Sequence, residues 1–105
     1  MQLEEILRGA LQKGATDVHL KAGVIPVIRR HGSLRPLSPN AAPLTSEQIE
    51  FMAMGLLNDE QQAHFQQYHE IDIGYGVTGL GRCRVSIFHQ RGTIRMVVRN
   101  IPFKV

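Results

Sequence analysis

The most constraining feature of this 105-residue sequence is an alternating stretch near its end, from Gly81 to Arg99. The stretch is rich in β-branched residues and has Arg91-Gly92 at its middle, which predicts a β-hairpin with a two-residue turn. With that turn, Arg84 lies directly opposite Arg99. A turn of odd length would put the apolar residues of the two strands on different faces, because a slip of one residue turns a whole strand over.

This register divides the hairpin into an apolar face and a polar face. Like charges directly opposite each other destabilise a sheet, so we interpret the opposed Arg84 and Arg99 as an anion site. Guanidinium groups suit phosphate oxygens, because they are permanently charged and bind bidentately. The apolar face, predicted to lie in the core, carries Cys83, Val85, Ile87, Ile94, Met96 and Val98, and the polar face carries Arg82, Arg84, Ser86, Phe88, Thr93, Arg95, Val97 and Arg99.

The charges of the chain are segregated along the sequence. The formal net charge is +3, but the segment from Pro36 to Gly81 holds six acidic residues and no Lys or Arg, whereas the segment from Arg82 to Val105 holds six basic residues and no acid. Such polarisation favours a charged partner. The length and the 43% hydrophobic content predict one small domain, residues 1–105. One cysteine suits a reducing compartment, and no signal peptide or membrane insertion is predicted.

The remaining elements follow from apolar spacing and capping signals. A helix is predicted from Leu3 to Leu11, and capping boxes at Thr45 and Asn58 begin two more helices. Strands are predicted at 16–22, 24–30, around residue 34 and at 70–77, and the proline at position 26 favours a sheet edge for the second of them. The order α-β-β-β-α-α-β-β-β predicts an α+β fold, in which helices pack mainly on one face of an antiparallel sheet.

The length of the loop at Thr78-Gly79 decides which residue of the preceding strand lies opposite Arg84. A loop with an odd number of residues places Asp72 there, and a loop with an even number places Ile73 there. Matching of polar residues favours the odd loop. Asp72 and Glu70 are then candidates for acids that hold the arginines in place.

The arginine face has three interpretations: a solvated basic strand, a nucleic-acid surface, or a nucleotide-phosphate site. Single-strand binders usually show several stacking aromatic residues, and only Phe88 interleaves with the arginines. A few arginines at fixed spacing suit a phosphate better. The chain has no G-x-x-x-x-G-K-[ST] loop, so a triphosphate must be held mostly by another domain. The five histidines lack metal-ligand spacing, and no metal site is predicted.

Two blocks of the sequence combine into a specific pattern. The first block is Ala15-Thr16-Asp17-Val18-His19-Leu20, then Gly23, Pro26, Ile28-Arg29 and Gly32. The second is Glu70-x-Asp72, Gly81-Arg82-Cys83-Arg84-Val85-Ser86, Gln90-Arg91-Gly92 and Val98-Arg99-Asn100-Ile101-Pro102. Together these blocks resemble the PilT family of type IV pilus retraction ATPases, in the secretion-ATPase superfamily. The two central helices match only in general character, and His31 stands where the family has Asp.

The resemblance implies a PAS-like N-terminal domain of a homohexameric motor that powers pilus retraction and twitching motility, with a RecA-like ATPase domain beginning past Val105. It implies that Arg84 and Arg99 act as arginine fingers on ATP, which the RecA-like domain holds with Mg²⁺. Arg82 and Arg95 are secondary members of the same basic face.

The implied partners are the RecA-like domains of the same and neighbouring subunits and an inner-membrane pilus platform protein. The implied location is the cytoplasm, at the inner membrane. The 105-residue chain alone is expected to be monomeric and without ATPase activity.

Two other functions stay open at this point. One is the N-terminal domain of a related pilus-assembly or type II secretion ATPase. The other is a stand-alone module that binds nucleic acid on its basic sheet or a small ligand in its core. A core-bound ligand would require an internal polar pocket, and the predicted core is mostly apolar.

Overall fold

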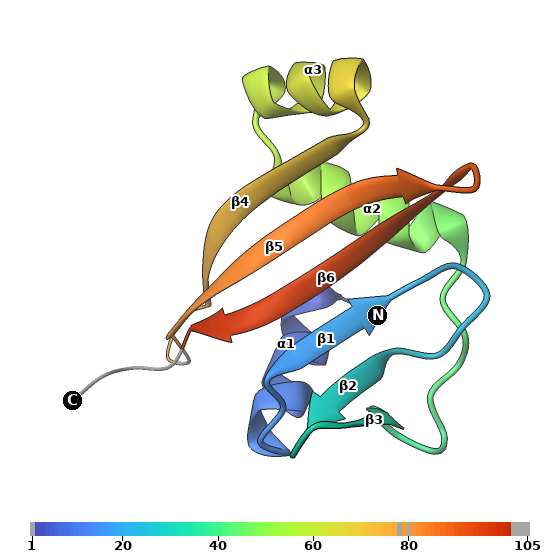
Figure 1. Ribbon diagram of the computed structural model, residues 1–105, viewed down its shortest axis with the longest axis vertical. Coiled ribbons are helices and arrows are strands. Elements are labelled where there is room, and N and C mark those ends of the chain that lie inside the picture. The colour runs from blue at the N-terminus through green and yellow to red at the C-terminus, as the bar shows by residue number, and fades with distance from the viewer. Residues whose placement is uncertain (1, 78, 80, 102–105) are drawn as a thin grey trace.

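The computed structural model, which describes residues 2–77, 79 and 81–101, has the predicted α+β fold and element order (Figure 1). Its strands form one antiparallel sheet in the order β3-β2-β1-β6-β5-β4. The elements are α1 (Leu3–Gln12), β1 (Asp17–Leu20), β2 (Val27–Arg30), β3 (Ser33–Pro36), α2 (Ser46–Leu56), α3 (Asp59–Tyr68), β4 (Glu70–Val77), β5 (Gly81–Gln90) and β6 (Thr93–Ile101).

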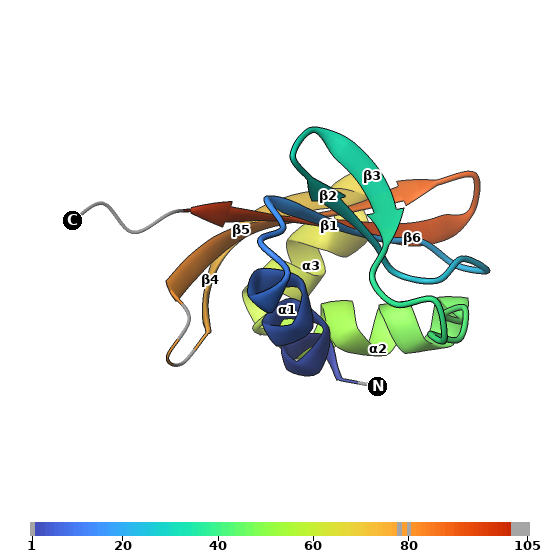
Figure 2. The same ribbon diagram turned by 90° about the horizontal axis from the view of Figure 1, so that it is seen from below.

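The helices gather on one side of the sheet and leave the other side uncovered (Figure 2). Helix α1 directs Leu3, Ile6, Leu7 and Ala10 inward, all at helical spacing. Helices α2 and α3 begin with complete capping boxes at the predicted residues, Thr45 and Asn58. The buried side chains of the described residues are all apolar, and no helix among them is long and apolar enough to cross a membrane.

The β5–β6 hairpin has the predicted register. Gln90 pairs with Thr93 across a two-residue turn, and Arg84 pairs with Arg99. Arg91 and Gly92 both have positive φ, +54° and +81°, as a turn of this kind requires. The six predicted core residues of the hairpin are at most 7% exposed, so its apolar face is confirmed as a wall of the core.

Two sequence predictions need correction. The β4–β5 connection has an odd number of residues, as expected, but the pairing is shifted by two residues. Gly74, not Asp72, lies opposite Arg84, and Asp72 lies opposite Ser86. Position 78 of this loop lies outside the described residues. The second strand was predicted at an edge because of Pro26; β2 instead lies between β1 and β3. The strand begins just after the proline, so the missing N–H interrupts no pair of the ladder.

Strand β1 connects the two halves of the chain. It pairs with β2 on one side and with β6 on the other, where Asp17 lies opposite Arg99. Asn100 reinforces this junction, because its backbone N–H donates to Thr16 O at 3.0 Å and its side-chain amide donates to Ala15 O at 2.7 Å. The first strand of the chain therefore lies beside its last.

The turn between β2 and β3 explains why His31 can replace the Asp of the resembling family. Arg30 pairs with Ser33, so His31 and Gly32 form a two-residue turn, with φ of +51° and +79°. Histidine, like Asp and Asn, is enriched among non-glycine residues at positive φ. The substitution is therefore compatible with the turn.

We predict that the inward and outward faces respond very differently to truncation. Ile87→Ala removes a side chain that is 1% exposed in the middle of β5 and should lower the free energy of unfolding by about 2–5 kcal/mol. Phe51→Ala, at a side chain that is 82% exposed on α2, is the control and should change it by less than about 0.5 kcal/mol. Urea unfolding measures both values, and equal losses would contradict the assigned core.

A second prediction concerns Cys83. Burial raises the pKa of its thiol above the ordinary value of 9.0, while the charge of Arg82 opposes the shift. A group whose pKa is raised on folding contributes fully to the free energy of unfolding at low pH. That contribution is lost as the pH rises from the pKa of the unfolded state through the pKa of the folded state. Stability should therefore fall above about pH 9, and less so in Cys83→Ala. Unfolding free energies at several pH values test this; an identical decline in both proteins would contradict it.

Candidate functional site

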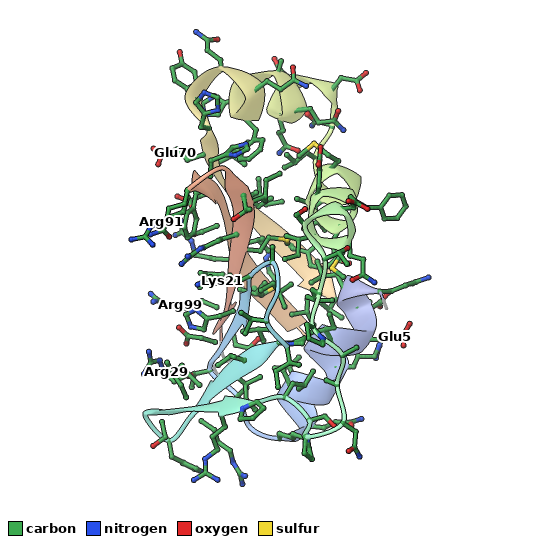
Figure 3. The ribbon with its side chains drawn as sticks, turned by 90° about the vertical axis from the view of Figure 1, so that its right-hand side faces the viewer. Glu5, Lys21, Arg29, Glu70, Arg91 and Arg99 are labelled. Carbon is green, nitrogen blue, oxygen red and sulfur yellow. The ribbon has the colours of Figure 1, made fainter. Side chains whose placement is uncertain are left out.

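The uncovered side of the sheet, called here the open face, carries the polar residues of the strands. Directly opposed residues of an antiparallel pair project from the same side, so the register fixes which residues share it. Figure 3 shows Glu70, Lys21, Arg99 and Arg29 projecting on this side and Glu5 projecting on the helix side. Further members, by register, are Arg82, Arg84, Ser86, Phe88, Arg95, Val97, Asp17, His19 and Asp72.

A row of charged residues crosses the centre of the open face. Four neighbouring strands place Arg84, Arg99, Asp17 and Arg29 opposite one another in turn, and we call these four residues the arginine row. The row contains three guanidiniums and one carboxylate. Its net charge is therefore positive, as an anion site requires.

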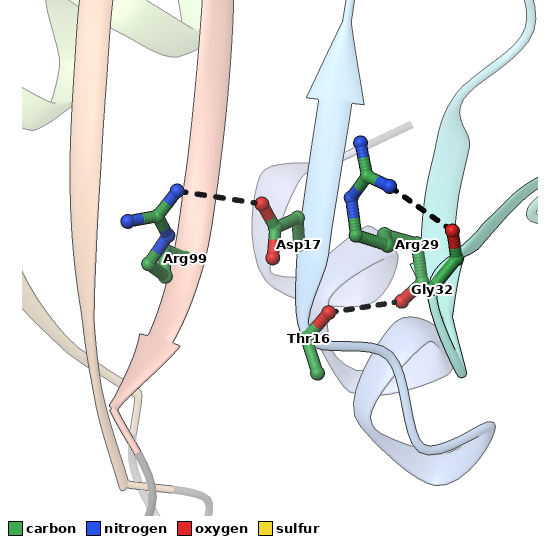
Figure 4. A network of polar contacts seen from close by, with 5 residues as sticks. All are labelled: Thr16, Asp17, Arg29, Gly32 and Arg99. Carbon is green, nitrogen blue, oxygen red and sulfur yellow. Dashed lines mark hydrogen bonds and ion pairs between the residues drawn. The ribbon is translucent and has the colours of Figure 1, made fainter.

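The ion pair within the row joins Arg99 on β6 to Asp17 on β1 (Figure 4). The distance between Arg99 Nη2 and Asp17 Oδ2 is 3.8 Å, and the Arg99 side chain is 71% exposed against 13% for Asp17. A long pair with one partner this exposed contributes about 0–1 kcal/mol. Asp17 therefore accompanies Arg99 without neutralising the row, and the Arg99 guanidinium remains open to solvent.

Arg29 lies at the far end of the row and is turned toward the β2–β3 turn. Its Nη1 donates to Gly32 O at 3.2 Å, while its own carbonyl accepts from the Thr16 hydroxyl at 3.3 Å (Figure 4). Sequence analysis did not select Arg29 or Asp17 as site residues. They join the row through the β1–β6 and β1–β2 pairings, which no local sequence pattern contains.

Arg82 and Arg95 differ from the members of the row. The guanidinium of Arg82 lies over β4, where its Nη2 is 3.2 Å from the position that a Cβ at Gly74 would take, so the glycine makes room for it. Arg95 is half-buried and its Nε has no hydrogen-bond partner. His19 Nε2 is also buried and unpartnered, and His19 pairs with Val97, two residues from Arg95.

The two acids that were expected to orient the arginines lie on the open face but make other contacts. Asp72 accepts a hydrogen bond from the Ser86 hydroxyl, and Glu70 lies opposite Phe88. Among the described residues, the carboxylate that meets an arginine of this face is that of Asp17.

Histidines near the end of α3 and the end of β5 make contacts between rings. His69 meets His89 edge-on with centroids 5.3 Å apart, and His89 stacks on Phe65 at 5.1 Å. No group of three or more His, Cys, Asp or Glu among the described residues is arranged to hold a metal ion. The arginine row carries fixed positive charge, which suits the open face to binding an anion.

This chain is similar in sequence to known pilus ATPases. No family model matches it. It is 36% identical over all 105 residues to two Pseudomonas aeruginosa proteins, the type IV pilus ATPase PilU and the type IV pilus retraction ATPase PilT, and spans 27% and 30% of their lengths.

A crystal structure of the pilus retraction motor PilT with bound ADP matches the fold over the whole chain, with a TM-score of 0.92 and 27% identity. The match covers 30% of that solved chain. The matches in sequence and in structure both span the whole of this chain, and they identify it as a PilT-like N-terminal domain.

Proposed function

We propose that this domain supplies arginines to ATP held by a RecA-like domain in a hexameric pilus motor. The observation that carries the proposal is the opposition of Arg84 and Arg99 on the open face. The register holds two exposed guanidiniums side by side, and one weakly paired carboxylate accompanies them. Supporting this, a similar protein carries bound ADP in its crystal structure.

In the proposed mechanism, Arg84 and Arg99 act as a pair of forks toward the β- and γ-phosphate oxygens. Each fork is permanently charged and planar, so it stabilises charge on a phosphoryl group as hydrolysis proceeds. Arg99 reaches from β6 toward Asp17 on β1, at 3.8 Å. The ion pair is weak enough to be exchanged for a phosphate contact without a large cost. Arg82 and Arg95 add positive potential beside the pair.

ATP and Mg²⁺ would be held mainly outside these 105 residues. The sequence has no phosphate-binding glycine loop, and no metal-ligand group occurs among the described residues. ATP supplies the phosphoryl group, and this domain contributes positioned positive charge. The rigid sheet that carries both arginines would couple movement of the domain to the state of the nucleotide.

The proposal extends to the assembly in which the domain works. Neighbouring subunits of a homohexamer would bring the open face toward RecA-like domains, and a pilus platform protein at the inner membrane would receive the motion. The location that follows is the cytoplasm. The entirely apolar set of buried side chains in the described residues weighs against the small-ligand sensor.

The sharpest test uses the full-length protein that carries this domain. Arg84→Ala and Arg99→Ala should each lower steady-state ATP hydrolysis about 100-fold or more, because arginine fingers elsewhere contribute about 10³–10⁵ in rate. Both side chains are exposed, so folding should be retained. Lysine at either position should restore little activity, because an ammonium group does not reproduce the two-pronged contact.

Arg91→Ala is the matched control, since Arg91 is an exposed arginine of the same hairpin that lies in its turn. It should leave turnover nearly unchanged. The phosphate-contact assignment is wrong if Arg91→Ala and Arg84→Ala lower turnover equally, or if neither Arg84→Ala nor Arg99→Ala lowers it.

The 105-residue chain alone provides a separate prediction. It should be folded, largely monomeric and inactive toward ATP, because it lacks the phosphate loop and carries only the arginine half of the proposed site. Light scattering and a phosphate-release assay measure these properties. A stable hexamer of the isolated chain would contradict the expectation that assembly depends mainly on the RecA-like domain. ATP turnover above background would contradict the proposed class of domain.

A further inference from the structure

The two edges of the sheet are built very differently. Strand β3, at one edge, has only four residues and ends at Pro36, which has no N–H to donate. Strand β4, at the other edge, pairs with β5 over eight consecutive residues without a bulge or a proline (Figure 1). Short length and proline are usual ways of blocking an edge, and β4 has neither.

The outer edge of β4 keeps its backbone groups available. Its inner edge pairs with β5, and no backbone hydrogen bond joins its outer edge to another described segment. The strand alternates along its length: Glu70 and Asp72 are exposed, whereas Ile71, Ile73 and Tyr75 are only partly buried against the core. An added strand would therefore gain both a hydrogen-bond ladder and apolar cover.

A hollow of 330 Å³ runs between helix α3 and the beginning of β4. Its lining residues are Glu60, Gln61, His64, Ile71 and Asp72. A second hollow shares three of them and extends to Glu70. Neither is lined by Lys or Arg, so the carboxylates give this margin of the sheet a negative character, opposite in sign to the arginine row.

We propose that the outer edge of β4 binds an extended basic segment of a partner protein as an additional strand. Side chains of an extended strand alternate between faces, so basic residues at every second position would lie beside Glu70 and Asp72. The intervening apolar residues would cover the exposed parts of Ile71 and Ile73. This inference is independent of the nucleotide contact, because it uses a different part of the sheet.

The probe for this surface is a fluorescein-labelled peptide, Lys-Val-Lys-Ile-Lys-Val, and its charge-reversed control is Glu-Val-Glu-Ile-Glu-Val. Fluorescence anisotropy should show saturable binding of the basic peptide below about 1 mM and weaker binding of the acidic one. Hydrogen exchange should slow at alternate amides of residues 70–76, because every second N–H of an edge strand points outward. Methylation of the alternate peptide nitrogens that face β4 should abolish binding without any change to the protein.

The protein variant Glu70→Lys/Asp72→Lys should weaken binding about tenfold or more, because it exchanges two attractions for repulsions. The control variant Glu5→Lys/Glu47→Lys makes the same charge change at exposed helix positions. It should bind the basic peptide almost as tightly as the original chain, with only the small loss of affinity that the change in net charge causes.

Four results would overturn the proposal. These are absence of binding at 1 mM peptide, equal binding of the acidic or methylated peptide, and protection at β3 instead of β4. The fourth is self-association that protects both edges, which would make a second copy the occupant.

Discussion

The two-residue turn between β5 and β6 is the constraint on which the rest of the structure depends. Its length decides which side chains of both strands enter the core, since side chains alternate with a period of two. A change of one residue on either strand would turn buried valines and isoleucines to water and move arginines inward. Burial of unpaired guanidiniums is far more costly than loss of a few apolar contacts. The hairpin therefore has one register that a folded chain can adopt.

This turn also sets the charge pattern of the open face, because the register that fills the core aligns Arg84 with Arg99. Exposure to water makes the repulsion between two guanidiniums tolerable, and solvent and salt screen much of it. Asp17 supplies a partner for Arg99 from β1 but leaves the row positive. Core formation and the alignment of the two arginines thus depend on the same register.

A single sheet separates opposite charges in this domain. The basic row lies across its centre, whereas the β4 margin and the adjoining helix α3 carry carboxylates. Along the sequence this appears as an acidic middle and a basic end. In space the two charge regions lie on neighbouring strands. Gly74, which accommodates the Arg82 side chain, lies on β4 between the acidic residues of that strand and the arginines of β5.

The local parts of this arrangement were predictable from the sequence. Capping boxes, the positive-φ turn residues and apolar alternation are short-range signals, and they predicted the helix starts, the hairpin and its buried residues. The β4–β5 register was harder. The alternation of polar and apolar residues predicted correctly that the connection between the two strands has an odd number of residues. How many residues it has depends on where the strand pairing ends, and the alternation does not determine that. Asp72 consequently pairs with Ser86 and not with Arg84.

The sequence alone determined the fold class, the paired arginines and the core face of the hairpin, because each depends on residues close together in the chain. Tertiary structure decided that β1 inserts between β2 and β6, which brings Asp17 to Arg99 across 82 positions of sequence. It also decided that the outer edge of β4 has no partner strand among the described residues and that Arg29 joins the arginine row. Such pairings are selected by how the whole sheet covers the helices, and no local spacing encodes that choice.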